Sequence, residues 1–256
     1  MSYIERKVCV VTGAASGFGL ITKQMLTERG ATVVGFDITD GEGCIVVDVT
    51  DRAAVQAAID DVVEVHGRID VLVNNAGVMP LAFMADHTQA ADAWDRCIDI
   101  NFKGVLHGVY AAYDHMDRQG SGHIVNIASI YGNYGIAGAS VYGATKAAVI
   151  ALSNSLRVEA QGKFKVTIVR PTGVPATNLL HGIVDFNAGF PIAGHNMEKM
   201  LGRGGDGDET RDVNDVRYWA PSPEDLAAHI VYAIDQPDGI NVSDITIRAT
   251  GEDYVF

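Results

Sequence analysis

Short apolar segments and amphipathic helical segments alternate along most of this chain. The first apolar run, Lys7–Thr12, is rich in Val, as is typical of a strand buried on both faces. A glycine-rich turn, Gly13–Gly19, follows it, and a helical pattern then extends from Phe18 to about Glu28. Strands that alternate with helices form right-handed βαβ units, which build a parallel sheet. The sequence therefore predicts an α/β fold with a doubly wound parallel sheet and helices on both of its faces.

The same alternation continues toward the C-terminus. Further strands are predicted at Ala31–Asp37, Gly43–Val47, Asp70–Val73, His123–Ala128, Lys165–Arg170 and Asp244–Ile247, about seven in all. Further helices are predicted at Asp51–His66, over a long region from about Thr88 to Met116, from Tyr142 onward, and at Ser222–Ile234. Only the glycine-rich stretch at about 172–220 interrupts the pattern, which is typical of a lid or binding loop. We expect one domain over residues 1–256 that carries this substrate-binding insert.

Composition and charge limit the classes of partner and ligand. The chain has 256 residues, 48% of them hydrophobic, which suits one large α/β core. Its formal net charge of −13, with no basic cluster, disfavours binding to nucleic acid or to an anionic membrane. The three cysteines and eight histidines show no disulfide framework and no metal-ligand spacing, so we expect no metal. Without a signal peptide or a run of transmembrane length, we expect a cytoplasmic protein.

The first strand–helix turn has the features of a dinucleotide site. Glycines in Gly13–Gly19 let the backbone approach an anion, and the following helix begins with free N–H groups. Asp37 ends the second predicted strand, where a carboxylate accepts hydrogen bonds from ribose hydroxyls and repels a 2′-phosphate. Neither Asp37–Asp40 nor the glycine turn contains Arg or Lys. The pattern therefore favours NAD over NADP.

Two polar segments follow later strands and would lie at the same edge of the sheet. Asn74–Gly77 comes directly after the fourth predicted strand. Asn and Gly suit a structural turn, and this position also lies beside any dinucleotide, so we expect both roles. Asp48 and Val49, just past the third strand, are similarly placed to contact an adenine.

A tyrosine and a lysine four residues apart open a predicted helix. Because side chains at this spacing lie on one helical face, the ammonium of Lys146 can lie near the phenol of Tyr142. A nearby cation favours the phenolate and lowers the pKa of a tyrosine. Ser129 ends the strand-like run HIVNIAS just before them. The pattern indicates a proton-transfer site.

The order and spacing of these motifs resemble the short-chain dehydrogenase/reductase family. The matching motifs are the glycine turn, the NNAG turn, Asn101, Ser129, Tyr142-x-x-x-Lys146 and Pro171–Thr177. The resemblance covers nearly the whole chain and implies a Rossmann-like fold, an alcohol dehydrogenase or ketone reductase activity, and a homotetramer. It implies that Tyr142 is the general acid/base, that Ser129 hydrogen-bonds the substrate oxygen, and that Lys146 binds the nicotinamide ribose and depresses the tyrosine pKa. It also implies that Asn101 holds a proton-relaying water.

The family's cofactor contacts carry over to matching positions. These are Gly13, Ser16, Gly17, Phe18, Gly19, Asp37, Ile38, Asp48, Val49, Asn75, Ala76, Gly77, Tyr142, Lys146, Pro171, Gly173, Val174 and Thr177. One departure concerns the segment after the sixth strand. The family usually has Pro-Gly and then a Thr that reaches the nicotinamide carboxamide, whereas this chain has an additional residue, Thr172, before its Thr177.

The substrate is expected beyond the carboxyl ends of the strands. The residues predicted to bind it are Met79, Ile130, Tyr131, Asn133, Tyr134, Leu180, Ile183 and Phe186. Because these residues are mostly apolar and no Arg or Lys accompanies them, we expect an uncharged, hydrophobic secondary alcohol or its ketone. Two alternatives stay open: a reductase of a carrier-bound 3-oxoacyl group, and a non-catalytic regulatory protein that binds NAD.

Overall fold

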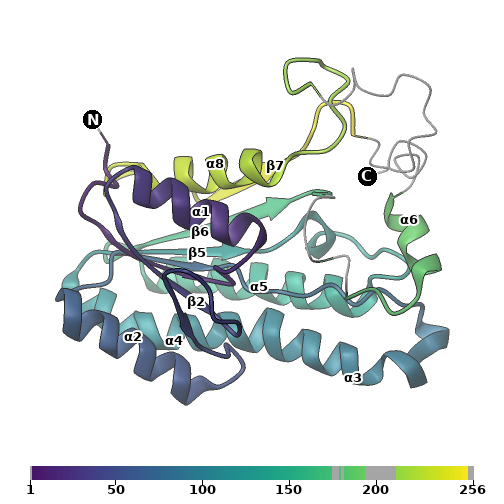
Figure 1. Cartoon of the computed structure of the whole chain (residues 1–256), viewed down its shortest axis with the longest axis horizontal. Coiled ribbons are helices and arrows are strands. Elements are labelled where there is room, and N and C mark those ends of the chain that lie inside the picture. Colours follow the sequence, from purple (N-terminus) through teal and green to yellow (C-terminus); the bar gives the residue numbers. More distant parts are fainter. Residues whose placement is uncertain (1, 175–178, 180–181, 194–211, 253–256) are drawn as a thin grey trace.

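A seven-stranded parallel sheet forms the centre of the protein (Figure 1). The structure, a computed structural model, describes residues 2–174, 179, 182–193 and 212–252. The strands lie in the order β3-β2-β1-β4-β5-β6-β7. Their bounds are β1 Val8–Thr12, β2 Thr32–Asp37, β3 Cys44–Val46, β4 Val71–Asn74, β5 His123–Ile127, β6 Lys165–Pro171 and β7 Asp244–Ile247. The predicted doubly wound sheet is confirmed, and its strand order reverses direction between β1 and β4.

Helices cover both faces of the sheet (Figure 1). On one face lie α1 (Gly17–Glu28) and α8 (Pro223–Ile234); on the other lie α2 (Arg52–His66), α4 (Val105–Gln119) and α5 (Ser140–Glu159). Successive strand residues point to opposite faces, so β1 contributes to two separate cores. Val10 packs in the core with residues of α2, α4 and α5, whereas Cys9 and Val11 pack with residues of α1 and α8.

The helix boundaries follow local sequence signals. Asp51 caps α2 by accepting hydrogen bonds from two backbone N–H groups, and Gly67 ends the helix with a left-handed φ of 77°. At α8, Ser222 and Asp225 form a capping box, and Pro223 occupies the first turn. The sequence predicts a helix over nearly the same range, Ser222–Ile234.

The long helical region predicted from about Thr88 to Met116 is divided into three parts. Helix α3 (His87–Ile98) leads into the π-helical turn η2 (Asp99–Gly104), and α4 follows. A π-helical turn holds an additional residue, which shifts the facing of the helix at that point. Here it places the buried amide of Asn101 against the backbone of Val78. Local periodicity does not reveal this break because each flank remains helical.

The described part of the predicted insert contains the short helical turns η5 (Phe186–Gly189) and α6 (Phe190–Ala193). Two further short turns are η1 (Met84–Asp86), in the connection after β4, and η3 (Ile130–Gly132), in the connection after β5. Thr177 and Leu180 lie outside the described residues. Within the described ranges, no helix has both the length and the apolar character needed to cross a membrane.

The buried histidine at the start of β5 makes the stability of the fold depend on pH. His123 is 2% exposed, and its Nε2 lies 2.7 Å from Thr167 Oγ1. Burial, reinforced by Lys165 and Lys7, lowers its pKa well below 6.5. Below about pH 6.5 the unfolded chain therefore binds a proton that the folded chain does not, and the free energy of unfolding falls as the pH decreases.

We predict that His123→Gln flattens this dependence. Between about pH 7.5 and about pH 5.5, the wild type should lose ~1.4 kcal/mol more unfolding free energy than the variant. Urea denaturation at both pH values measures the difference. Equal losses in the two proteins would show that His123 is not the group responsible.

Candidate active site

An elongated cavity of about 1330 Å³ crosses the carboxyl ends of the central strands. Its lining takes Asp37 from β2, Gly13 from the loop after β1, Asn75 after β4, Ser129 after β5 and Pro171 from β6. β2 and β6 are four strand spacings apart, which is ~19 Å. The cavity therefore spans the point where the strand order reverses, which is where open α/β sheets bind extended ligands.

The glycine loop brings bare backbone to the middle of this cavity. Gly13 and Gly17 have left-handed φ values of 66° and 54°. A Cβ added to Gly19 would overlap the carbonyl oxygen of Gly13, and one added to Gly13 would lie 2.9 Å from Ala76 Cα. Ser16, at the start of α1, makes no side-chain capping bond. The backbone N–H groups of the first turn thus face no competing side chain, and this arrangement fits the phosphates of a dinucleotide.

Hydrogen bonds join the Asn74–Gly77 turn to the glycine loop. Asn75 Nδ2 donates to the carbonyl oxygens of Thr12 and Gly13, at 2.9 and 3.2 Å. In return, Thr12 Oγ1 accepts from the backbone N–H groups of Asn75 and Ala76, at 2.9 and 3.0 Å. The turn is therefore structural, as expected, and Asn75, Ala76 and Gly77 also line the cavity.

Asp37 closes one end of the cavity. Its Oδ2 accepts from Ala15 N at 3.0 Å, and its Oδ1 accepts from the backbone N–H and the hydroxyl of Thr39 at 3.1 and 3.0 Å. The predicted neighbours Ile38, Asp48 and Val49 line the same cavity. Among the described lining residues, the basic side chains are Arg96 and Lys146, and neither belongs to the segments 36–39 or 47–50 at this end.

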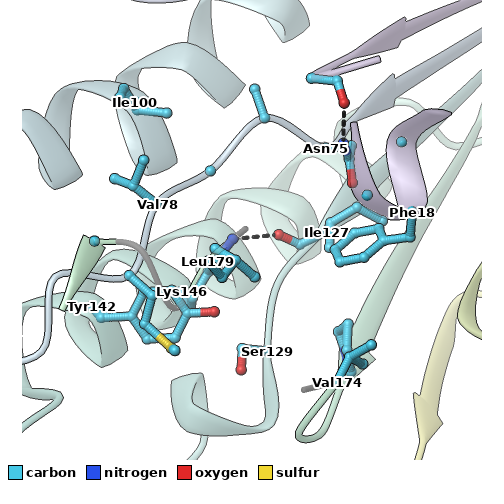
Figure 2. A pocket seen from close by; sticks show the side chains of 18 of the residues that line it. Phe18, Asn75, Val78, Ile100, Ile127, Ser129, Tyr142, Lys146, Val174 and Leu179 are labelled. Carbon is cyan, nitrogen blue, oxygen red and sulfur yellow. Dashed lines mark hydrogen bonds between the residues drawn. The ribbon is translucent and has the colours of Figure 1, made fainter. Parts of the chain in front are cut away.

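Ser129, Tyr142 and Lys146 meet at the other end of the cavity (Figure 2). The hydroxyl of Ser129 is hydrogen-bonded to Tyr142, and it accepts from Tyr131 N at 3.2 Å. Lys146 Nζ donates to the carbonyl oxygen of Ile127 at 2.9 Å and lies 5.7 Å from the centroid of the Tyr142 ring. All three side chains are largely buried, and all three line the cavity through which a ligand can reach them.

Burial controls the protonation of this group. It raises the pKa of Tyr142 above the ordinary value, and the hydrogen bond from Ser129 opposes the change only in part. It also lowers the pKa of Lys146 from 10.5 to about 8. The net pKa of Tyr142 is therefore raised by burial in the protein chain alone, and the expected lowering of it by Lys146 stays a prediction. Both groups are desolvated, and desolvation disfavours phenolate and ammonium alike.

Asn101 lies behind these residues rather than in the cavity lining. Its Oδ1 accepts from Val78 N, and its Nδ2 donates to Val78 O, both at 2.9 Å. The same Nδ2 lies 3.3 Å from Thr145 Oγ1 and from Cys97 Sγ. The side-chain amide thus fixes the chain after β4 to the helix that carries Lys146. The expected role of Asn101 in holding a water stays a prediction.

The predicted substrate residues divide into three groups. Met79, Tyr131, Ile183 and Phe186 line the cavity. Three others are not among the described lining residues: Ile130, Asn133 and Tyr134. Ile130 packs in the apolar cluster with Met79 and Tyr142. Asn133 accepts a hydrogen bond from Arg170 Nη1 at 2.6 Å, and Tyr134 is 57% exposed. Tyr131 lies within the short turn η3, whereas Asn133 and Tyr134 follow that turn and are exposed. Leu180 lies outside the described residues.

Every predicted cofactor residue except Thr177, which is not described, lines the cavity. The lining also contains residues that the sequence did not suggest: Leu81, Asp92, Asp95, Arg96, Asp99, Ile100, Trp219, Ala220 and Glu252. Helical spacing in α3 and at the start of η2 offered a signal for Asp92, Arg96 and Asp99. No local pattern indicates Trp219 or Glu252, because the fold returns them from the far end of the chain.

Comparisons of the sequence with known proteins agree on one family. A sequence model of the short chain dehydrogenase family matches residues 7–187. An uncharacterized oxidoreductase of Staphylococcus saprophyticus is 34% identical, and the match covers 98% of this chain and 99% of the relative. A 3-oxoacyl-[acyl-carrier-protein] reductase of Thermotoga maritima is 37% identical over 184 residues, which are 66% of this chain and 74% of the relative.

Solved structures agree with that result. A serine dehydrogenase complexed with NADP+ superposes with a TM-score of 0.78 at 27% identity, covering 97% of both chains. A short-chain dehydrogenase from Streptomyces avermitilis superposes with a TM-score of 0.75 at 28% identity, covering 94% of this chain and 88% of that one.

The close backbone contact at Gly19 yields a direct test of the cofactor site. We predict that Gly19→Ala weakens dinucleotide binding at least about tenfold, because its Cβ displaces the loop that would hold the phosphates. Gly239→Ala is the control, since a Cβ there meets nothing within 4 Å. Fluorescence titration with NADH and thermal unfolding measure binding and stability. Wild-type affinity in the Gly19 variant would contradict the assignment of this loop.

Proposed function

This chain belongs to the short-chain dehydrogenase family, and we propose that it is an NAD-dependent oxidoreductase that interconverts an uncharged, hydrophobic secondary alcohol and its ketone. One observation carries the proposal. Ser129, Tyr142 and Lys146 converge at one end of a cavity whose middle is lined by a glycine loop suited to phosphates. A proton-transfer group and a dinucleotide site in one cavity are what hydride transfer to or from a carbon–oxygen bond requires.

Each residue of the group has a distinct task in the proposed reaction. A nicotinamide dinucleotide, when bound, provides the acceptor or donor of hydride. Tyr142 donates a proton to the substrate oxygen during reduction and accepts it during oxidation. Ser129 orients that oxygen and stabilises the charge that develops on it. The hydrogen bond between Ser129 and Tyr142 supports this pairing, since it already directs both hydroxyls to one point.

Lys146 provides charge rather than the proton itself. With a pKa of about 8, its ammonium is still mostly protonated at neutral pH. At 5.7 Å from the Tyr142 ring centroid, it stabilises the phenolate that forms during proton transfer, which is the charged state that burial disfavours. Burial therefore favours the neutral phenol at rest, and the ammonium of Lys146 lowers the free-energy cost of forming the phenolate.

The carboxylate of Asp37 supports NAD as the cofactor. Its oxygens are held in place by Ala15 and Thr39, so it cannot easily turn away from a 2′-phosphate. The segments beside it add a second carboxylate, Asp48, and no cation. The NADP+ seen with the structurally similar serine dehydrogenase belongs to that protein. Here the local charge would repel the additional phosphate.

Apolar lining supports an uncharged substrate. Beside the catalytic end, the described lining residues include Met79, Leu81, Tyr131, Ile183 and Phe186. Such a surface binds an alicyclic or aromatic body by burial rather than by ion pairing. A panel in which only charged acids turned over would contradict this substrate class.

A second candidate function is reduction of a carrier-bound 3-oxoacyl group. The 37% identity to the Thermotoga maritima reductase favours it, although that match covers only 66% of this chain. A non-catalytic NAD-binding regulator is the third reading, and the assembled Ser129, Tyr142 and Lys146 speak against it. Turnover of 3-oxoacyl thioesters but not of simple ketones would establish the second candidate. Tight NAD binding without any turnover would establish the third.

We also propose that copies of the chain assemble as a homotetramer. Helix α5 carries Ala144, Ala147 and Ala151 on its exposed side, and small side chains permit close helix packing. Sedimentation analysis of the purified protein tests the assembly.

We predict that Tyr142→Phe lowers turnover by about 10²- to 10⁴-fold, because the variant retains the ring but has no proton to transfer. NADH affinity should change little. Tyr110→Phe is the control, since Tyr110 is 51% exposed on α4. Steady-state rates and NADH titration give the two quantities. Turnover retained by the Tyr142 variant would overturn the proton-transfer assignment.

We predict that the wild type binds NADH at least about tenfold more tightly than NADPH, and that Asp37→Asn reduces this ratio by removing the repulsive charge. Asp61→Asn, on the exposed side of α2, is the control and should leave the ratio unchanged. Titrations with both reduced dinucleotides measure the ratio. Equal wild-type affinities would rule out NAD preference.

A further inference from the structure

The C-terminal segment returns to the cavity after the last strand of the sheet. β7 ends at Ile247, and the turn Ala249–Glu252 follows. Glu252 lines the cavity together with Ser129 and Tyr142, yet only 7% of its surface is exposed. A buried carboxylate is costly unless it has a specific partner. Its contacts therefore indicate what it does.

Glu252 and the end of β7 hold consecutive residues of the loop that follows β6. Thr172 donates twice to the carbonyl oxygen of Ile247, from its backbone N–H at 3.1 Å and from its hydroxyl at 3.2 Å. Gly173 N donates to Glu252 Oε1 at 3.1 Å. The loop Thr172–Val174 therefore takes its conformation from the C-terminal segment rather than from its own sequence.

The turn that carries Glu252 is itself tightly held. Gly251 N donates to Tyr218 O at 2.7 Å, and a Cβ added to Gly251 would overlap the backbone of Arg217. Glu252 N also donates to Ala249 O at 3.3 Å. The next residue along the chain from Tyr218, Trp219, is buried and lines the cavity as well. The Glu252 carboxylate thus belongs to a turn that backbone hydrogen bonds hold in place.

The proposed chemistry would bring the reactive ring of the cofactor beside this loop. In that reaction hydride would move to or from the carbon whose oxygen contacts Ser129 and Tyr142, so the nicotinamide would lie at the β5–β6 end of the cavity. Gly173 and Val174 line that end, and Figure 2 shows Val174 with Ser129 and Tyr142 around the same space. The oxidised ring is positively charged and the reduced ring is neutral. A carboxylate nearby therefore stabilises the oxidised form selectively.

We propose that Glu252 is a positioning residue for the nicotinamide end of the site: it holds the loop Thr172–Val174 through the N–H of Gly173, and its negative charge favours the oxidised cofactor. This inference rests on the proposed function, because it assumes that the cavity binds a nicotinamide dinucleotide. It also accounts for the additional residue after Pro171. The lengthened loop is anchored by a side chain from the C-terminal turn.

Two variants separate the two parts of this role. Glu252→Gln keeps an oxygen that can accept from Gly173 but removes the charge. Glu252→Ala removes both. Calorimetric titration gives the dissociation constants for NAD+ and NADH, and thermal unfolding confirms that each variant is folded. Glu159→Gln, at the exposed end of α5, is the matched control for loss of one carboxylate.

We expect Glu252→Ala to weaken NADH about tenfold, since the loop loses a hydrogen bond to a charged group, and to weaken NAD+ more than NADH, since the negative charge is lost as well. Glu252→Gln should weaken NAD+ about fivefold and change NADH less than about twofold, because only the oxidised ring is charged. Wild-type binding of both forms by the alanine variant would overturn the positioning role. Equal weakening of both forms by the glutamine variant would overturn the role of the charge.

The test distinguishes this inference from the proposed function. If the wild type binds neither NAD(H) nor NADP(H), the proposed function fails. If the wild type binds NAD+ and NADH and the Glu252 variants match it, only the role of Glu252 fails. Should NADP(H) prove to be the tighter ligand, the same comparison of oxidised and reduced forms applies to it.

Discussion

The contact between the chain after β1 and the chain after β4 is the constraint on which the rest of the site depends. A Cβ at Gly13 would lie 2.9 Å from Ala76, and Asn75 and Thr12 exchange hydrogen bonds across the same junction. This junction occurs where the strand order reverses, so the two loops diverge on either side of it. Its rigidity fixes the middle of the cavity. The end of the cavity at Asp37 and the end at Ser129 and Tyr142 are then placed by the neighbouring strands.

Desolvation determines how the reacting end works. Tyr142 and Lys146 are both buried, and both are pushed toward their neutral forms. In the proposed reaction the tyrosine is therefore a proton donor at rest, and it would need the nearby ammonium and the hydrogen bond from Ser129 to accept a proton. The buried carboxylate of Glu252 adds charge of the opposite sign to the same cavity. In the proposed reaction, a few fixed charges in a buried site would thus control both proton transfer and the state of the cofactor.

The sequence predicted much of this arrangement because its strongest signals are local. Alternating strands and helices determine the sheet, and motif spacing brings Tyr142 and its partners together. Contributions from distant segments were not predictable in the same way. Glu252 reaches the cavity through contacts with residues far away in the sequence, and the π-helical turn that holds Asn101 interrupts a pattern that looks continuous. Likewise, the raised pKa of Tyr142 and the outward position of Asn133 depend on burial and on turn geometry, which single-sequence patterns do not encode.

The most direct test of the account is transfer of a labelled hydride. The protein is incubated with NAD+ and a panel of hydrophobic secondary alcohols that carry deuterium on the carbinol carbon, and the nicotinamide absorbance and the mass of the cofactor are followed. The account predicts that at least one alcohol yields its ketone and that the deuterium appears in the reduced cofactor. Tight binding of NAD+ with no deuterium transfer from any alcohol, and none in the reverse direction from labelled NADH to the matching ketones, would contradict it.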